Sequence, residues 1–233
     1  MNEKAQITNR KIEKKLPHDS VLMLTLDIDY PQIHLTGSAF AEMLVNHAYR
    51  REARHFAAYA RDDLFPNAVD DYEESIIKGF PFHPYEAVMR YDITLNRDCV
   101  VSATTDHYEF TGGAHGNTVR FSDSFDLRTG YRIRMRDLFP KVEDCRPIVL
   151  EQVLRQADER TQAEPGVFFD DYRTLIIKYF NPQSFFLTPR TLGVYYQEYE
   201  IAPYASGIVV FEMPYEDLGI RRPGCGPRSG DNA

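Results

Sequence analysis

One short stretch of the sequence holds most of the side chains that could do acid–base or metal chemistry. Asp106, His107, Glu109 and His115 fall close together in the chain. Histidines and carboxylates together can bind zinc or transfer protons. Their spacing matches no established metal motif, and no Gly-x-Ser-x-Gly, Walker or HExxH motif is present. A metal-dependent His/carboxylate enzyme is therefore the weaker alternative, and we expect no catalytic residue, no metal and no cofactor.

Three glycines surround the last of these histidines. Gly112, Gly113 and Gly116 lie, with His115, between two alternating strand patterns. Glycine takes positive φ or lets another group approach closely at little cost. The segment therefore predicts a turn of unusual shape. We expect the His115 ring to hydrogen-bond the backbone of this turn and to hold its shape.

A second candidate surface lies in the loop 199–207. Tyr199, Pro203 and Tyr204 stand there, in a chain with 15 Tyr, 15 Phe and no Trp. A proline fixes the shape of a loop, and a tyrosine beside it offers an anchor ring. We predict that this loop and the glycine turn bind a partner. The alternative is that both loops only shape corners of a sheet.

Charge and composition limit the partners. The net charge is −8 and the isoelectric point about 5.4, which disfavours nucleic acid and anionic membranes and is compatible with a basic partner or with solubility alone.

No apolar run approaches a membrane span, and the N-terminus has no signal peptide, so as written we expect a cytoplasmic protein. Cys99, Cys145 and Cys225 form no CxxC pair, which argues against a disulfide framework, and Cys99 reads as a small core residue.

Periodicity predicts the elements that position these residues in the first part of the chain. Residues 1–15 are expected to be a frayed lead-in, and a strand over 21–30 is expected to end at Tyr30-Pro31. A long helix opens at the N-cap Ser38 and is interrupted at Pro66-Asn67, and Gly79 ends the short helix that follows. The long helix carries one apolar stripe, made of Val45, Tyr49, Ala53, Phe56, Ala60 and Leu64.

Further strands and helices follow in series. A hairpin over 87–110 and a strand over 118–125 precede the later elements. Helices are expected over 143–162 and 168–180, before short strands over 184–188, 193–197 and 207–213. The series predicts an α+β fold, with antiparallel sheets, one long helix in the N-terminal half and further helices inserted in the C-terminal half. We expect domains over 16–122 and 123–218, with a disordered tail over 219–233.

These residues resemble a known bacterial family. Its marks are the turn Thr111-Gly112-Gly113-Ala114-His115-Gly116, the hairpin that begins Phe125-Asp126-Leu127, and the C-terminal signatures 195–207 and 211–215. The family pairs two domains of unknown function, and the resemblance spans about 16–218. Its best understood members are the RsiV-type anti-sigma factors, whose extracellular part binds lysozyme. The first domain also occurs in a peptidoglycan deacetylase, outside its catalytic domain.

The resemblance implies an α+β fold and binding without catalysis. It places contact with lysozyme, or another basic protein, on Pro203 and Tyr204, and relatives are often extracytoplasmic. The sequence shows neither a transmembrane segment nor a sigma-binding region, so we do not expect signalling to a sigma factor. A peptidoglycan or glycan binder is the alternative, with Tyr195, Tyr196, Tyr199 and Tyr204 as sugar platforms, although sugar sites commonly use Trp.

Overall fold

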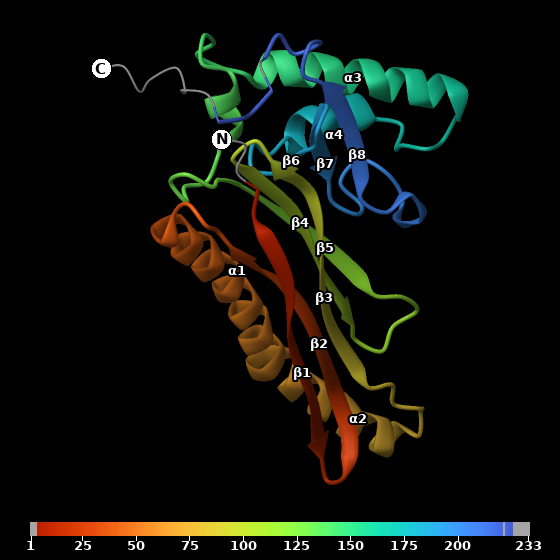
Figure 1. Cartoon of the computed structure of the whole chain (residues 1–233). Coiled ribbons are helices and arrows are strands. Elements are labelled where there is room, and N and C mark those ends of the chain that lie inside the picture. The colour runs from red at the N-terminus through yellow and green to blue at the C-terminus, as the bar shows by residue number, and fades with distance from the viewer. Residues whose placement is uncertain (1–3, 221, 226–233) are drawn as a thin grey trace.

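The first half of the chain is a long twisted sheet with a helix across one face (Figure 1). The computed structural model describes residues 4–220 and 222–225. The sheet has five strands in the order β1-β2-β3-β4-β5, and every pairing is antiparallel except that of β2 with β3. Its strands are β1 (Gln6–His18), β2 (Val21–His34), β3 (Tyr85–Arg97), β4 (Val100–Phe110) and β5 (Asn117–Asp126).

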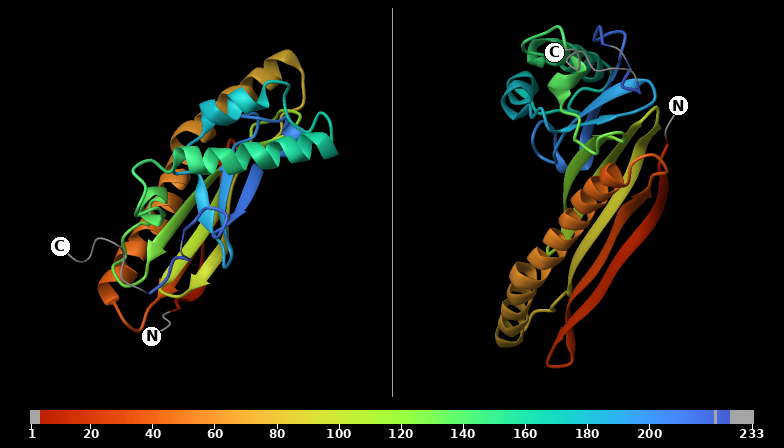
Figure 2. Two further views of the ribbon diagram at one scale, coloured as in Figure 1. Left: turned by 90° about the horizontal axis from the view of Figure 1, so that it is seen from above. Right: turned by 60° about the vertical axis from the view of Figure 1, so that its left-hand side comes forward.

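A continuous helical segment joins the two parallel strands. Ser38 caps its first turn, as expected, because its hydroxyl accepts from Ala41 N at 3.1 Å. The whole predicted stripe is buried against the sheet, and Gly79 ends the segment with φ 73°. The segment comprises α1 (Ala39–Tyr59), a π-helical turn (Ala60–Leu64) and α2 (Phe65–Lys78), and Figure 2 shows how it follows the sheet.

The expected interruption at Pro66-Asn67 is wrong. Pro66 lies in the first turn of α2, directly after the π-helical turn. A proline is tolerated there because the residues of a first helical turn need no N–H donor within the helix. The π turn and the proline thus change the hydrogen bonding of the segment without ending it.

Two expectations about the first strands are also wrong. Most of the expected lead-in 1–15 is strand β1, and only residues 1–3 lie outside the described part of the chain. β1 is an edge strand with mostly exposed polar side chains, so no apolar pattern marks it. Pro31 continues β2, because β3 pairs only with Leu24 to Ile28 and a proline beyond them removes no ladder bond on that side.

The second half forms its own layer at the other end of the molecule (Figure 1). A three-stranded antiparallel sheet packs against two helices around a core that includes Val149, Ile176 and Phe211. This arrangement confirms the expected α+β fold with helices inserted late. The elements are α3 (Arg146–Ala163), α4 (Tyr172–Tyr179), β6 (Phe185–Leu187), β7 (Thr191–Tyr196) and β8 (Val209–Pro214), with short 3-10 turns at Met135–Leu138 and Tyr204–Ser206.

The two halves meet along the outer edge of β5. Gln197 clamps the backbone of Arg120, since its Oε1 accepts from Arg120 N at 2.9 Å and its Nε2 donates to Arg120 O at 2.7 Å. Farther toward the glycine turn, Glu198 Oε2 accepts from Thr118 N on the same edge at 3.1 Å. The second half also reaches the neighbouring strand β4, where the hydroxyl of Ser102 accepts from Leu187 N at 3.0 Å. The exposed edge of the sheet is thus covered by the second half. Because β5 runs across residue 122, the division at 122/123 stays a prediction.

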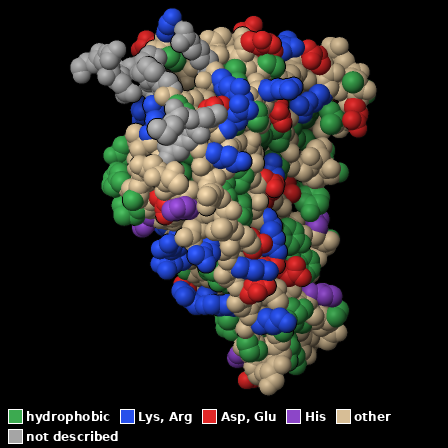
Figure 3. All heavy atoms as spheres, in the orientation of Figure 1, with side chains coloured by type: hydrophobic (Ala, Val, Ile, Leu, Met, Phe, Trp, Pro, Cys, Tyr) green, Lys and Arg blue, Asp and Glu red, His purple; other side chains and the backbone are tan. Residues whose placement is uncertain are grey.

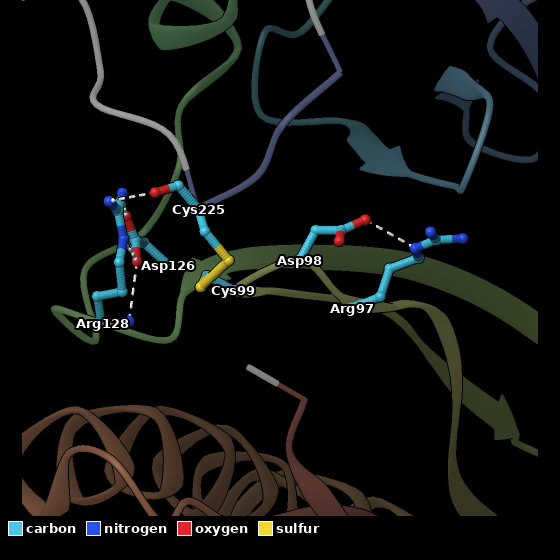
Figure 4. Close-up of a disulfide and its surroundings, with 6 residues drawn as sticks. All are labelled: Arg97, Asp98, Cys99, Asp126, Arg128 and Cys225. Atoms are coloured by element: carbon cyan, nitrogen blue, oxygen red, sulfur yellow. Dashed lines mark hydrogen bonds and ion pairs between the residues drawn. A yellow bond between two sulfur atoms is a disulfide. The ribbon is translucent and has the colours of Figure 1, made fainter. Parts of the chain in front are cut away.

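The chain also contains a disulfide, contrary to expectation. Cys99 and Cys225 are joined, with a sequence separation of 126 and Cα atoms 5.1 Å apart (Figure 4). Cys99 stands in the β3–β4 turn with φ 63°, and the carbonyl oxygen of Cys225 accepts from Arg128 Nη1 at 3.2 Å. So much chain separates the two cysteines that sequence spacing gave no sign of the bond. Of the expected tail, 221 and 226–233 lie outside the described residues.

Candidate functional site

The glycine turn and the tyrosine loop meet in space and stack their rings. The centroids of His115 and Tyr204 lie 3.9 Å apart with an interplanar angle of 21°. Tyr204 stacks in turn on Tyr199 at 5.7 Å and 28°. We call these three side chains the His–Tyr ladder. His115 is exposed and Tyr199 is 51% exposed, so the ladder forms part of the surface.

The glycine turn has the unusual shape that its sequence predicts, and two of its glycines account for it. Gly112 has φ 82°. A Cβ on Gly116 would lie 2.3 Å from the Tyr108 ring, so only glycine fits there. Gly113 meets neither condition. His115 Nδ1 donates to Gly116 O at 2.9 Å, which confirms the expected bond within the turn.

Buried residues and a hydrogen bond to β5 hold the tyrosine loop in place. Ile201 and Ala202 are buried, and Pro203 is exposed at the start of the short turn that carries Tyr204. Glu198 Oε2 accepts from Thr118 N at 3.1 Å, which ties the loop to β5 just after the glycine turn. The structure therefore brings the predicted His115 next to the loop that carries Tyr199, Pro203 and Tyr204. Gly112 and Gly116 give the turn around His115 its shape.

The acid–base residues of β4 do not converge. Strand alternation places Asp106 on the opposite face from His107 and Glu109. Within the described residues, no group of three or more His, Cys, Asp or Glu side chains is placed to hold a metal ion. Each of the three has a different partner, namely Arg120 for Asp106 at 2.7 Å, Glu52 for His107 at 3.4 Å and Tyr59 for Glu109 at 3.1 Å.

A cleft that the sequence did not indicate lies between α1, β5 and the second half. Its volume is about 620 Å³. His107 lies in its wall, stacked on Phe56 at 4.2 Å, and Phe121 is 45% exposed in it. Burial raises the pKa of Asp123, another lining residue, to about 6, although Arg132 Nε lies 2.6 Å away. We call this space the interface cleft. The structure shows Phe121 as an exposed apolar side chain on a strand, and this residue is the one sign of the cleft that the sequence carries.

Two family models match the chain in succession. Residues 19–118 match the family described as "Deacetylase PdaC", and residues 136–216 match "Protein of unknown function (DUF3298)". Each match covers less than half of the chain, and we call the two matched stretches the PdaC-type region and the DUF3298-type region. The His–Tyr ladder therefore joins the last turn of the PdaC-type region to a loop of the DUF3298-type region. The match to the first family assigns no deacetylase activity to this chain.

Two solved structures share the fold over nearly the whole chain. A DUF3298 family member from Bacteroides fragilis has a TM-score of 0.60 at 19% identity, and the match covers 92% of this chain and 92% of that one. A DUF3298 family protein from Pseudomonas aeruginosa PAO1 has a TM-score of 0.61 at 19% identity, and covers 95% of this chain and 97% of its own. No curated protein matches the sequence. The resemblance to RsiV-type proteins in particular stays a prediction.

Proposed function

We propose that this tandem of PdaC-type and DUF3298-type regions is a non-catalytic binding protein that contacts a protein partner through the His–Tyr ladder. The stacking of His115 on Tyr204 carries the proposal. It fixes exposed rings from two regions of the chain in one arrangement before any partner arrives. Aromatic rings held in this way supply contact area while losing little conformational entropy on binding.

The ladder suits a protein better than a glycan. Its rings stack on one another, so Tyr204 lies between the rings of His115 and Tyr199 and offers no free face of its own. A sugar platform needs an open ring face. Two of the expected platform residues, Tyr195 and Tyr196, are only 4% and 1% exposed. A glycan remains the second candidate, through the outer face of Tyr199 alone.

The charge of the chain favours a basic partner. The net charge of −8 attracts a cationic protein at long range, which raises the association rate more than the affinity. Glu198 lies beside the ladder and contributes to raising the pKa of Tyr204, behind desolvation. Lysozyme, which the RsiV-type resemblance suggests, is the first partner to test.

Calorimetry with lysozyme tests the proposal. We expect binding by the unchanged chain, and at least a tenfold weaker Kd for Tyr204→Ala and for Tyr199→Ala, since central aromatic anchors carry most of the energy of an interface. Tyr131→Ala is the matched control, because Tyr131 is 63% exposed on another loop. No heat with lysozyme at about 100 μM would end the lysozyme version. If the ladder variants lost binding to insoluble cell wall instead, the glycan candidate would replace it.

The disulfide bears on the compartment in which such a partner would be met. Disulfides persist in oxidising compartments and are rare in the cytosol. We therefore favour an extracytoplasmic location over the cytoplasmic one expected from the sequence. Among the described residues no helix is long and apolar enough to cross a bilayer. Thiol labelling of the protein in freshly broken cells tests this: two reactive cysteines at positions 99 and 225 would contradict it.

A further inference from the structure

The outer face of α1 carries three arginines close together. Arg50, Arg51 and Arg54 are exposed, and none forms an ion pair in the described part of the chain. Many other described arginines, Arg120 and Arg132 among them, are paired with a carboxylate, whereas Arg160 donates to the carbonyl oxygen of Val210. The contrast is notable in a chain with 35 acidic and 27 basic residues, where carboxylates are plentiful.

The arginines converge with two histidines on one hollow. His47 and His55 line it with the three arginines, and its volume is about 330 Å³. At 100° per residue these five side chains fall within about 140° of the helix circumference, over about 12 Å of its length. Figure 3 shows Lys and Arg side chains gathered over α1 with a histidine beside them. We call this surface the arginine face.

The arginine face is electrostatically unfavourable in the free protein. Like charges at i and i+4, as in Arg50 and Arg54, repel each other. Two carboxylates near α1 have other ion-pair partners, since Glu52 lies 3.4 Å from His107 and Asp123 lies 2.6 Å from Arg132. Arg51 is attracted to Asp123 only as a minor contribution to the pKa of that carboxyl. A bound anion would remove the repulsion.

We propose that the arginine face binds an anion with phosphoryl groups and at least two negative charges. A guanidinium group pairs bidentately with two phosphate oxygens. Three such groups around one hollow offer more donors and more positive charge than a single carboxylate can use. A free polyphosphate and an anionic phospholipid headgroup present this same chemistry. The inference is independent of the His–Tyr ladder and of its partner.

Titration of the full chain with inorganic tripolyphosphate at low salt tests the proposal. The Arg50→Gln/Arg51→Gln/Arg54→Gln variant should bind at least tenfold more weakly. A matched variant removes the same charge at three exposed arginines that already have carboxylate partners, and its affinity should fall less than threefold. Its substitutions are Arg134→Gln, Arg155→Gln and Arg173→Gln. Thermal unfolding should show that all three proteins are folded, with the first variant no less stable than the unchanged chain.

A second arm separates the two sources of phosphate. Sedimentation with phosphatidylglycerol vesicles, compared with phosphatidylcholine vesicles, reports binding to a lipid headgroup. If the chain binds tripolyphosphate, whether or not it also binds vesicles, the result supports a soluble ligand. If it binds phosphatidylglycerol vesicles and not tripolyphosphate, the result supports a lipid. In either case the arginine-face variant must lose the binding. Equal losses in the two triple variants would show that only net charge matters, and no binding in either arm would overturn the proposal.

Discussion

Replacing Asp123 with asparagine should make the protein more stable at neutral pH. Asp123 lies in the interface cleft with only 18% of its side chain exposed. Burial raises its pKa from 3.8 to about 6, and this outweighs the attraction of Arg132. The carboxylate is thus tolerated in the folded protein at neutral pH, at a cost in free energy that the neutral amide avoids.

The pH range of the effect follows from the sign of this pKa shift. The folded pKa lies above the unfolded value, so the folded protein holds a proton that the unfolded chain has already lost between about pH 4 and pH 6. Stability therefore falls through this range as pH rises, and the loss is complete above it. At about 1.4 kcal/mol per pKa unit, the rise from 3.8 to about 6 corresponds to about 3 kcal/mol.

Urea unfolding at pH 4.0 and pH 7.5 measures this effect. Asp123→Asn should match the unchanged chain at pH 4.0 and exceed its free energy of unfolding by about 2–3 kcal/mol at pH 7.5. Asp158→Asn is the matched control of opposite sign, because its hydrogen bond with Arg173 lowers the pKa of Asp158. That control should lose stability at pH 7.5. If Asp123→Asn is destabilised at pH 7.5, the ion pair with Arg132 outweighs burial and the reasoning fails.

Two further changes test the glycine turn and the disulfide. Gly116→Ala should cost about 1–3 kcal/mol in urea unfolding, because its Cβ would meet the Tyr108 ring at 2.3 Å. Gly113→Ala should change stability by less than about 0.5 kcal/mol, because a Cβ there would meet only His115 O at an ordinary contact distance of 3.8 Å. Equal effects would refute the packing argument. Cys225→Ser should cost up to about 5 kcal/mol, as expected for a cross-link that closes a loop of 126 residues. A reductant should bring the unchanged chain to the same stability and leave the variant unaffected, and no effect of the reductant on the unchanged chain would show that the sulfurs are not joined.

The spacing of apolar residues in the sequence predicted those helices and strands in which buried side chains recur at regular intervals. The stripe from Val45 to Leu64 predicted α1 and the π-helical turn that follows it, because each of its residues is buried. The same reasoning missed β1, where most side chains are exposed and the few half-buried apolar ones do not alternate regularly, so the strand is held mainly by backbone pairing with β2. It also misread Pro66, since a proline in a first turn and a proline that breaks a helix look alike in sequence.

The candidate site was predictable in its parts but not as a whole. The glycines indicated an unusual turn, and Pro203 with Tyr204 indicated a shaped loop. That His115 and Tyr204 stack could not be known, because 89 positions separate them and only the packing of the two halves brings them together. The interface cleft was missed for the same reason, since α1, β5 and β7 each supply part of its wall.

The bond between Cys99 and Cys225 links the chain before the DUF3298-type region to the chain after it. Before this region, Leu127 N donates to Cys99 O at 2.8 Å, and after it Cys225 is bonded to the side chain of the same residue. A single protease nick anywhere between these two points would leave the fragments covalently attached. The nicked protein would run as two pieces on a reducing gel and as one on a non-reducing gel. Because the disulfide joins the two ends of this part of the chain, cleavage of one of its loops need not separate the His–Tyr ladder into two molecules.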